Sequence, residues 1–211
     1  MVFIFLIGLI GQIFFFARTF IQWLLSERQR KVLSPALYWI FSLIGSCIFF
    51  VYGWMRNDFS IILGQLITYF IYIWNLKIKG LWSKVFVVFQ ILLYLLPIAI
   101  LFYFFGHLSM LFDTFFCKKD IPLWLILFGS VGQIIFSLRF VYQWYYSYRK
   151  QCSILPAGFW YISLTGSLII IIYAIIRRDP ILLLGQSVGL IAYIRNIIIG
   201  RKETTEKATK Q

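Results

Sequence analysis

Seven apolar stretches alternate with short polar segments along this chain. Each is close to the length of about 20 residues that a helix needs to cross roughly 30 Å of hydrocarbon. The pattern therefore predicts an all-α integral membrane protein with seven transmembrane helices. The stretches cover residues 2–25, 36–55, 61–78, 83–106, 122–146, 157–176 and 181–199.

The composition agrees with a membrane protein, since 62% of the residues are hydrophobic and only 13% are charged. The net charge of +13 does not indicate nucleic-acid binding, because the basic residues lie in short loops between apolar stretches. Twelve of the 20 lie on one side of the predicted membrane, in the loops 26–35, 79–83 and 147–156, in the C-terminal tail, and at the flanking Lys77 and Lys84. The positive-inside rule therefore predicts a periplasmic N-terminus and a cytoplasmic C-terminus. The first stretch has no basic segment before it, so we expect a retained helix and not a cleaved signal peptide.

The chain contains an internal duplication. Residues 8–80 align without a gap with residues 129–201, and about 28 of the 73 pairs are identical. Because the second copy starts four helices after the first, both copies are expected to enter the membrane in the same direction, as parallel repeats do. The predicted parts are a three-helix repeat at 1–80, a linker helix and outer loop at 81–121, a second three-helix repeat at 122–200, and a polar cytoplasmic tail at 201–211.

Polar residues share one face of the first helix in each copy. Gly8, Gly11, Gln12, Phe15, Arg18, Gln22 and Ser26 form a stripe at helical spacing, and all seven recur 121 residues later. The glycines allow a neighbouring helix to approach closely. Two such polar faces are predicted to line a central site. The candidate ligand-binding residues are Arg18, Arg139, Gln12, Gln133, Gln22, Gln143, Trp39, Trp160, Asn75 and Asn196.

The amides and hydroxyls allow a second interpretation. Gln12, Ser42, Ser46, Gln65 and Asn75 suit interhelical hydrogen bonds, each worth on average about 0.6 kcal/mol. Both interpretations, ligand contact and helix packing, remain open for these residues.

Arg18 and Arg139 need a stronger reason to lie within apolar helices. An arginine at mid-span costs about 2.5–3.5 kcal/mol on insertion scales. Their side chains either reach out to cytoplasmic headgroups or point inward, and the glycines on the same face favour the inward direction. An inward guanidinium needs an anion, and a phosphate suits its planar set of donors. The acidic residues Glu27, Asp58, Asp113, Asp120, Asp179, Glu203 and Glu206 all lie outside the span interiors. These arginines are therefore predicted to hold the phosphate of a lipid.

Two acidic residues occupy equivalent outer turns. Asp58 precedes the third helix, and Asp179 precedes Pro180 at the start of the seventh. An acidic residue followed by proline is typical of a helix N-terminus. The alternative is an outer gate in which Asp58 pairs with Arg56 and Asp179 pairs with Arg177.

The sequence offers no recognisable catalytic centre. His107 is the only histidine, and Cys47, Cys117 and Cys152 have neither CxxC spacing nor a metal-like arrangement. The predicted membrane interior lacks a group that titrates near neutral pH for acid and base catalysis. A nucleotide-binding loop is also missing. We therefore expect no metal, no cofactor and no enzymatic activity.

Several motifs resemble a known family. GQIFFFARTFIQWLLSE, SPALYW, SLIGS, ILGQ and YIWN, with GQIIFSLRFVYQWYYS, LPAGFW, SLTGS, RRDP, LLLGQ and YIRN, are similar to the lipid-A-disaccharide synthase N-terminal domain family. The resemblance covers both repeats. It implies a fold like that of the SWEET and PQ-loop membrane proteins, and a link to lipid A or related envelope glycolipids. It carries no catalytic residues, and the glycosyltransferase domain is not in this sequence.

Three functions follow from these features. The first is binding or translocation of a phosphorylated glycolipid, either a lipid A precursor or a polyprenyl-phosphate sugar, in the bacterial inner membrane. The second is a non-catalytic accessory that anchors or presents lipid to a separate cytoplasmic glycosyltransferase. The third is transport of a small sugar.

Overall fold

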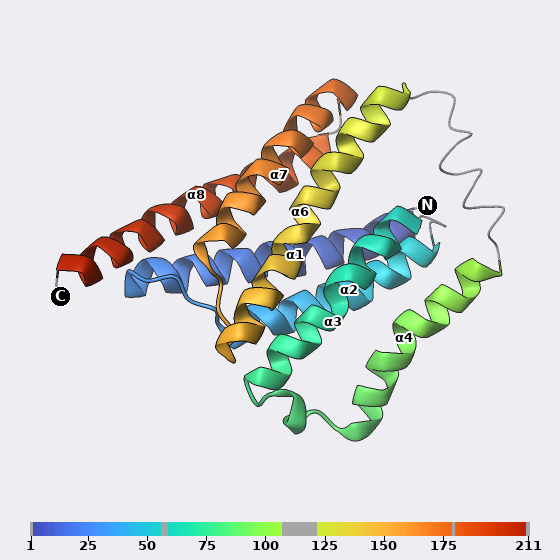
Figure 1. Cartoon of the computed structure of the whole chain (residues 1–211). Coiled ribbons are helices and arrows are strands. Elements are labelled where there is room, and N and C mark those ends of the chain that lie inside the picture. The colour runs from blue at the N-terminus through green and yellow to red at the C-terminus, as the bar shows by residue number, and fades with distance from the viewer. Residues whose placement is uncertain (1, 56–58, 107–121, 179, 210–211) are drawn as a thin grey trace. The chain divides into compact units, whose positions relative to one another are not determined.

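The computed structural model describes residues 2–55, 59–106, 122–178 and 180–209, and in these residues it is helical without any strand (Figure 1). The prediction of an all-α protein is confirmed, and the order of seven long helices matches the seven apolar stretches. The helices are α1 (Val2–Gln29), α2 (Ala36–Met55), α3 (Phe59–Ile78), α4 (Val87–Phe105), α6 (Leu123–Lys150), α7 (Ala157–Arg177) and α8 (Pro180–Thr209), with a short 3-10 helix η1 (Trp82–Lys84) before α4.

Three of these helices are long and apolar enough to cross a membrane. They are Leu6–Gln29, Ala36–Met55 and Ala157–Ile176, and Val87–Tyr103 is a shorter apolar helix. The arrangement of three helices, a linker and three helices in a membrane therefore stays a prediction.

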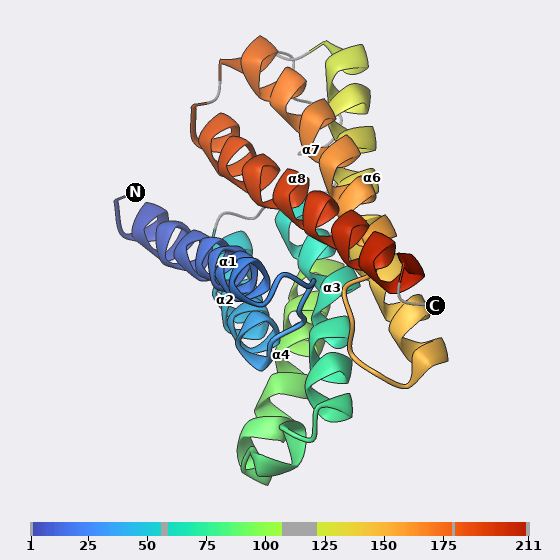
Figure 2. The same cartoon turned by 90° about the vertical axis from the view of Figure 1, so that its left-hand side faces the viewer.

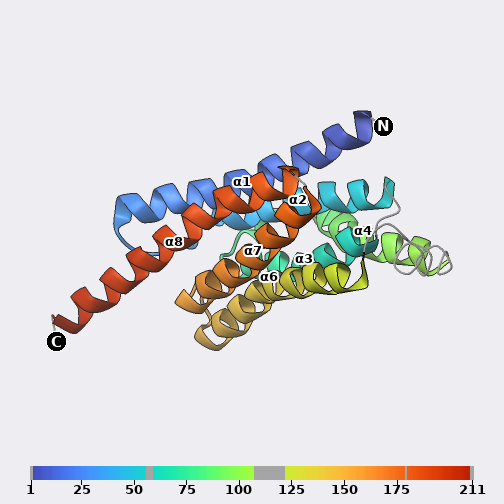
Figure 3. The same cartoon turned by 90° about the horizontal axis from the view of Figure 1, so that it is seen from above.

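The last helix differs from the predicted end of the second repeat. Residues 201–209, expected as a polar tail, continue α8 to Thr209, and Figure 3 shows these turns extending beyond α7. In the first copy the helix stops at Ile78, and Gly80 follows with a φ of 68°. Glycine adopts this left-handed conformation without a steric penalty. Its counterpart Arg201 lies within α8, so the helix continues there.

The chain folds into two compact units that do not coincide with the repeats. Unit 1 comprises residues 1–15 and 39–122, and unit 2 comprises residues 16–38 and 123–211. The second half of α1 and the loop after it therefore pack with the helices of the second repeat. The boundaries 1–80, 81–121 and 122–200 describe the sequence repeats rather than these packing units.

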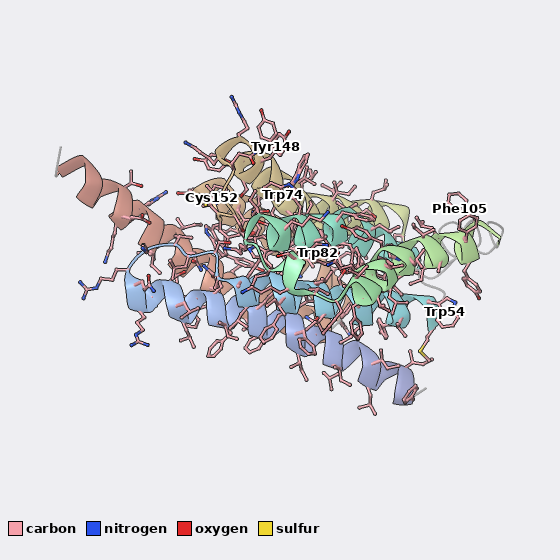
Figure 4. The ribbon with its side chains drawn as sticks, turned by 90° about the horizontal axis from the view of Figure 1, so that it is seen from below. Trp54, Trp74, Trp82, Phe105, Tyr148 and Cys152 are labelled. Carbon is pink, nitrogen blue, oxygen red and sulfur yellow. The ribbon has the colours of Figure 1, made fainter. Side chains whose placement is uncertain are left out.

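In unit 1 the start of α1 packs on α2, and α4 returns along α3. A Cβ at Gly8 would lie 2.7 Å from the Tyr52 ring, so only glycine fits at this contact. The Tyr69 hydroxyl donates to the Leu93 carbonyl at 2.8 Å, which joins α3 to α4 (Figure 2). Trp82 is buried in η1 between these two helices, and the exposed side chains of Trp54 and Phe105 lie at the other end of the unit (Figure 4).

In unit 2, α7 lies between α6 and α8 (Figures 1 and 2). The contact of α6 with α7 repeats that of α1 with α2, because a Cβ at Gly129 would lie 2.7 Å from the Tyr173 ring. Gly129 and Tyr173 are the counterparts of Gly8 and Tyr52. The predicted close approach at the glycine face is confirmed in both copies.

Candidate functional site

Arg18 and Arg139 both lie inside unit 2. Their side chains are 6% and 5% exposed, so neither guanidinium reaches out to solvent or lipid in the described structure. Arg18 comes from the second half of α1 and Arg139 from the equivalent turn of α6. The repeat thus brings two equivalent arginines, 121 residues apart in sequence, into the same packing unit.

One phenyl ring contacts both guanidiniums. The Phe140 ring centroid lies 5.1 Å from Cζ of Arg18 and 4.8 Å from Cζ of Arg139. The two Cζ atoms are therefore no further apart than the sum of these distances. At a separation of about 10 Å and an effective dielectric constant of about 20, two unit charges repel by roughly 1.7 kcal/mol. The aromatic faces offset part of this repulsion, since a cation over a ring is stabilised by about 0.5–2 kcal/mol.

Further aromatic side chains surround the two arginines. Cζ of Arg18 lies 5.4 Å from the centre of the Tyr38 ring. Cζ of Arg139 lies 3.3 Å from the centre of the Phe136 ring and 5.8 Å from those of Phe159 and Tyr193. The pair of arginines is thus set in an aromatic layer built from α1, the start of α2, α6, α7 and α8.

Arg139 keeps a donor unused within this layer. Its Nη1 donates to the Tyr193 hydroxyl at 3.3 Å. Its Nε is buried and has no hydrogen-bond partner among the described residues. A buried donor without an acceptor costs about 1–3 kcal/mol, and more when it belongs to a charged group. The Nε atom therefore marks a place where an acceptor would stabilise the protein.

Trp160 presents a second unused donor beside the first. Its indole Nε1 is buried without a hydrogen-bond partner in the described part of the chain, and the residue is 1% exposed. Its ring lies 6.1 Å from that of Tyr193 and 4.8 Å from that of Phe159, measured between centroids. Arg139 contacts the same two rings. Two buried donors without an acceptor among the described residues, Arg139 Nε and Trp160 Nε1, thus lie beside the same aromatic rings. Both residues are among the ligand-binding candidates predicted from the sequence.

Comparison with known proteins identifies the family. The sequence profile described as the Lipid A Biosynthesis N-terminal domain matches residues 7–77 and again residues 128–198. The two matches have the same spacing of 121 residues as the internal duplication. The chain belongs to this family. It carries two tandem copies of the domain, which links it to lipid A biosynthesis.

Similar proteins are named lipid-A-disaccharide synthase. The chain is 31% identical to that of Chlamydia caviae over 208 residues and 30% identical to that of Chlamydia felis over 207 residues, each match covering 94% of this chain. The protein of Chlamydia pneumoniae is 30% identical over 204 residues. These matches cover 33% of each relative, so the chain spans about a third of their length. No solved structure matches the chain significantly.

The two domain copies hold the loops after their first helices in the same way. Gln22 Nε2 donates to Ser26 Oγ at 2.9 Å and to the Leu33 carbonyl at 3.2 Å, while Leu33 N donates to Ser26 Oγ. The second copy repeats this, with Gln143 Nε2 donating to Ser147 Oγ at 2.9 Å and to the Ile154 carbonyl at 3.0 Å. Both glutamines are fully buried. Their amides thus serve loop packing, and contact with a sugar stays a prediction.

These hydrogen bonds accompany an unusual backbone turn. α1 and α6 are each followed directly by a non-glycine residue with positive φ, Arg30 at 52° and Gln151 at 48°. Such a conformation is uncommon outside glycine. The glutamine and serine on the buried face of each helix hold the following loop in place through hydrogen bonds. These bonds stabilise the uncommon backbone conformation of the turn. The loops also touch each other, since the hydroxyls of Ser34 and Ser153 lie 3.2 Å apart.

Asn196 connects the two copies through Gln22. Gln22 Nε2 donates to Asn196 Oδ1 at 2.8 Å, and Asn196 Nδ2 donates back to Gln22 Oε1 at 3.1 Å. Both side chains are fully buried. Asn75, the counterpart of Asn196, is also fully buried, and each asparagine donates to the carbonyl four residues earlier in its helix. The Gln22 and Asn196 amides, which were candidate ligand-binding residues, thus form an interhelical hydrogen-bond pair.

An ion pair lies near this amide pair, and sequence reasoning did not find it. Arg195 binds Glu27 through two nitrogens, one of them Nε, which donates to Oε2 at 3.2 Å. Trp23 Nε1 donates to the same carboxylate at 3.3 Å. The sequence analysis placed Glu27 outside the span interiors and assigned no role to Arg195. The signal that marks the pair is the asymmetry of the repeat, because the counterparts of Glu27 and Arg195 are Tyr148 and Trp74, which carry no charge.

The remaining candidates lie in different surroundings. Gln12 and Gln133, at the edge of the polar stripe, are exposed. Trp39 is fully buried with its ring 6.3 Å from that of Tyr72, the same pairing as Trp160 with Tyr193. Ser46 and Ser167 donate to Gln65 and Gln186 at 2.9 and 3.0 Å, which joins α2 to α3 and α7 to α8.

Two further expectations concern the outer turns and metal binding. Asp58 and Asp179 lie outside the described residues, while α8 begins at Pro180 as the sequence predicts. The part of the chain that the structure describes contains no cluster of three or more His, Cys, Asp or Glu side chains suited to a metal ion.

Proposed function

We propose that this protein binds the phosphate group of an envelope glycolipid, either a lipid A precursor or a polyprenyl-phosphate sugar, and that it translocates this lipid across the bacterial inner membrane. Arg18 and Arg139 hold the phosphate, and Trp160 donates to an oxygen of the phosphate or of the sugar. Membership in a lipid A biosynthesis family supports the choice of lipid.

The observation that carries the proposal is the pair of unused donors around Tyr193. Arg139 Nε and Trp160 Nε1 are both buried without an acceptor among the described residues. Buried polar groups in native proteins are almost always hydrogen-bonded, so two such exceptions in one cluster call for a ligand rich in acceptors. A phosphate ester attached to a sugar supplies both charge and acceptors, and arginine suits it particularly well.

The proposal includes an orientation. The basic loops after α1 and α6 face the cytoplasm, and the N-terminus faces the periplasm, because positively charged loops favour the cytoplasmic side. The two arginines then lie in the cytoplasmic halves of α1 and α6, about three turns before the ends of these helices. A lipid made on the cytoplasmic side would present its phosphate at this depth.

Reconstitution tests the proposal directly. The purified protein is expected to retain a phosphorylated glycolipid that native mass spectrometry detects, and Arg18→Ala and Arg139→Ala are expected to reduce both this lipid and its flipping in vesicles. Gln65→Ala is the matched control, since this residue accepts a hydrogen bond from Ser46 in unit 1. Unchanged lipid content and flipping in both arginine variants would overturn the phosphate site.

A second function has specific support from the relatives. The chain spans about a third of proteins named lipid-A-disaccharide synthase, so in those proteins about two thirds of the length lies outside the matched region. We propose as the alternative that the chain anchors or presents lipid to a separate glycosyltransferase through its basic cytoplasmic loops. Co-purification of such an enzyme, lost when Arg28, Arg30 and Lys31 are changed to glutamine, would favour the accessory function over independent translocation.

A further inference from the structure

We infer that Tyr193 is a further ligand-binding residue of the proposed phosphate site, and that its hydroxyl donates a hydrogen bond to an oxygen of the bound phosphate. Arg139 and Gly189 hold this hydroxyl in position. The inference rests on the proposed function and adds to the site a residue that was not among the candidates predicted from the sequence.

The Tyr193 hydroxyl is set in a layer of aromatic rings. The residue is 7% exposed, and its ring centroid lies 6.1 Å from that of Trp160 and 6.3 Å from that of Phe136. A phenylalanine would place the same ring in this layer without burying a polar group. A buried hydroxyl that lacks hydrogen bonds costs about 1–3 kcal/mol, so the hydroxyl needs partners for both its oxygen and its hydrogen.

The structure supplies a partner for the oxygen alone. Arg139 Nη1 donates to the Tyr193 oxygen at 3.3 Å. A guanidinium has no acceptor, so it cannot take the phenol hydrogen in return. In the described part of the chain Tyr193 takes part in no second hydrogen bond. The phenol hydrogen is thus a third buried donor beside Arg139 Nε and Trp160 Nε1, which also lack an acceptor among the described residues.

Three donors of this kind fit a ligand group that only accepts hydrogen bonds. They belong to a guanidinium, an indole and a phenol, and one of them carries a positive charge. A phosphate offers several acceptor oxygens together with negative charge, which makes each of these bonds stronger than one between neutral groups. Phosphate monoesters and phosphodiesters both have terminal oxygens, so the argument applies to every lipid named in the proposed function.

Gly189 makes room for the hydroxyl. Both residues lie in α8, and helical side chains lean toward the helix N-terminus, so that of Tyr193 covers the turn that contains Gly189. A Cβ at Gly189 would lie 2.8 Å from the Tyr193 hydroxyl oxygen and 3.1 Å from its Cζ. An alanine would therefore shift the hydroxyl, the free end of a side chain, and leave the helix backbone in place. The counterpart of Gly189 in the first copy is Thr68, so the glycine belongs to the second copy alone.

Removal of the hydroxyl tests the inference in the full chain. The probe is phosphatidic acid, and diacylglycerol with the same acyl chains is the lipid control without a phosphate. Native mass spectrometry is expected to show that Tyr193→Phe binds phosphatidic acid about tenfold less than the wild-type protein does, the usual order for a hydrogen bond to a charged group. Binding of diacylglycerol should not change. Tyr161→Phe is the matched control, because the Tyr161 hydroxyl accepts from Arg201 Nε at 3.0 Å in an exposed position of the same unit.

Gly189→Ala separates the position of the hydroxyl from the stability of the fold. Alanine is favoured over glycine within a helix by about 1 kcal/mol, so this variant should be at least as stable as the wild-type protein in an unfolding assay. It should nevertheless bind phosphatidic acid severalfold less, because the hydroxyl moves. Gly200→Ala is the control on the same helix, since a Cβ there would lie 3.5 Å from the Val32 side chain, an ordinary contact. Full binding of phosphatidic acid by Gly189→Ala would contradict the positioning role of the glycine.

Arg139→Gln distinguishes failure of this inference from failure of the proposed function. If Arg139→Gln loses phosphatidic acid while Tyr193→Phe and Gly189→Ala retain it, Tyr193 serves packing and the phosphate site stands. Tighter binding by Tyr193→Phe would mean that the hydroxyl competes with the lipid for Arg139, which also overturns the inference. If binding of phosphatidic acid depends on none of the three residues, the proposed site fails as well.

Discussion

Gln22 and Asn196 exchange hydrogen bonds in both directions between α1 and α8, at 2.8 and 3.1 Å, with both side chains fully buried. These two residues come from different repeats. The bond pair therefore ties the first helix of one domain copy to the last helix of the other within unit 2.

Replacing Gln22 with leucine is expected to lower the free energy of unfolding by about 1–3 kcal/mol, because Asn196 and the loop after α1 lose buried hydrogen bonds. Unfolding in mixed micelles measures this change. Gln12→Leu is the matched control on the same helix, since Gln12 is exposed, and its effect should stay within about 0.5 kcal/mol. A double-mutant cycle with Asn196→Leu should show coupling; fully additive effects would mean that the amide pair contributes nothing of its own.

Gly166 is expected to tolerate no side chain. A Cβ there would lie 2.7 Å from the backbone nitrogen of Phe136 and 2.8 Å from its Cα, so α7 would have to move away from α6. Gly166→Ala should therefore destabilise the protein by about 1–3 kcal/mol. At Gly64 in α3 a Cβ would meet no heavy atom within 4 Å, and Gly64→Ala should be neutral or stabilise by up to about 1 kcal/mol. Equal effects of the two substitutions in an unfolding assay would refute the close helix contact.

The ion pair of Glu27 with Arg195 predicts recovery on charge exchange. Glu27→Arg places two positive charges together and should lower the melting temperature. The double variant Glu27→Arg with Arg195→Glu restores opposite charges and should recover most of the lost melting temperature. Both side chains are about two-fifths exposed, at 40% and 43%, so the effect should shrink at high salt. Arg28→Glu, a charge reversal at the exposed neighbouring position, serves as the control. Failure of the double variant to recover would show that the charges themselves do not matter.

Cysteine labelling tests the orientation. Cys152 is exposed in the loop after α6, which is predicted to face the cytoplasm, and Cys117 lies in the predicted outer loop. In variants that keep only one of these cysteines, a membrane-impermeant maleimide added to spheroplasts should label Cys117 at once and Cys152 only after lysis. Figure 4 shows Cys152 at the loop end of α6 near the outward-pointing Tyr148. The reverse labelling pattern would place the basic loops in the periplasm and overturn the orientation.

Much of the helix packing within each copy could be predicted from the sequence. Helical periodicity puts Gly8, Gly11, Arg18, Gln22 and Ser26 on one face, and the structure buries all five. The same periodicity holds for their counterparts. Local spacing thus determines which side of a helix is covered, since a face rich in glycine and polar groups packs poorly against lipid.

The partners across the copies could not be predicted in this way. Glu27 and Arg195 are 168 positions apart, and Gln22 and Asn196 are 174 apart. Their contacts depend on which helix of one copy meets which helix of the other, and no local pattern carries that information. The exposed positions of Gln12 and Gln133 have a simpler cause, because these residues sit at the edge of the stripe and a small rotation of the helix turns them outward.

Phe140 provides the last prediction, because its ring contacts both arginines. Phe140→Leu removes the aromatic face and keeps an apolar side chain. It should therefore lower the free energy of unfolding more when Arg139 is present than when Arg139 is replaced by glutamine. The expected coupling is about 0.5–2 kcal/mol, the usual range for a cation over a ring, and a double-mutant cycle of unfolding free energies measures it. Ile170→Val is the control in the same cycle, since Ile170 is buried near Gly132, about two turns of α6 from Arg139.

Phosphatidic acid should change this cycle in a specific way. A bound phosphate neutralises the two guanidiniums and stabilises the folded state by mass action, so the added lipid should raise the melting temperature of the wild-type protein and of Phe140→Leu alike. It should leave the Arg139→Gln variants almost unchanged. If the lipid stabilises all four proteins equally, it acts through the surrounding micelle, and the aromatic layer around the arginines serves packing alone.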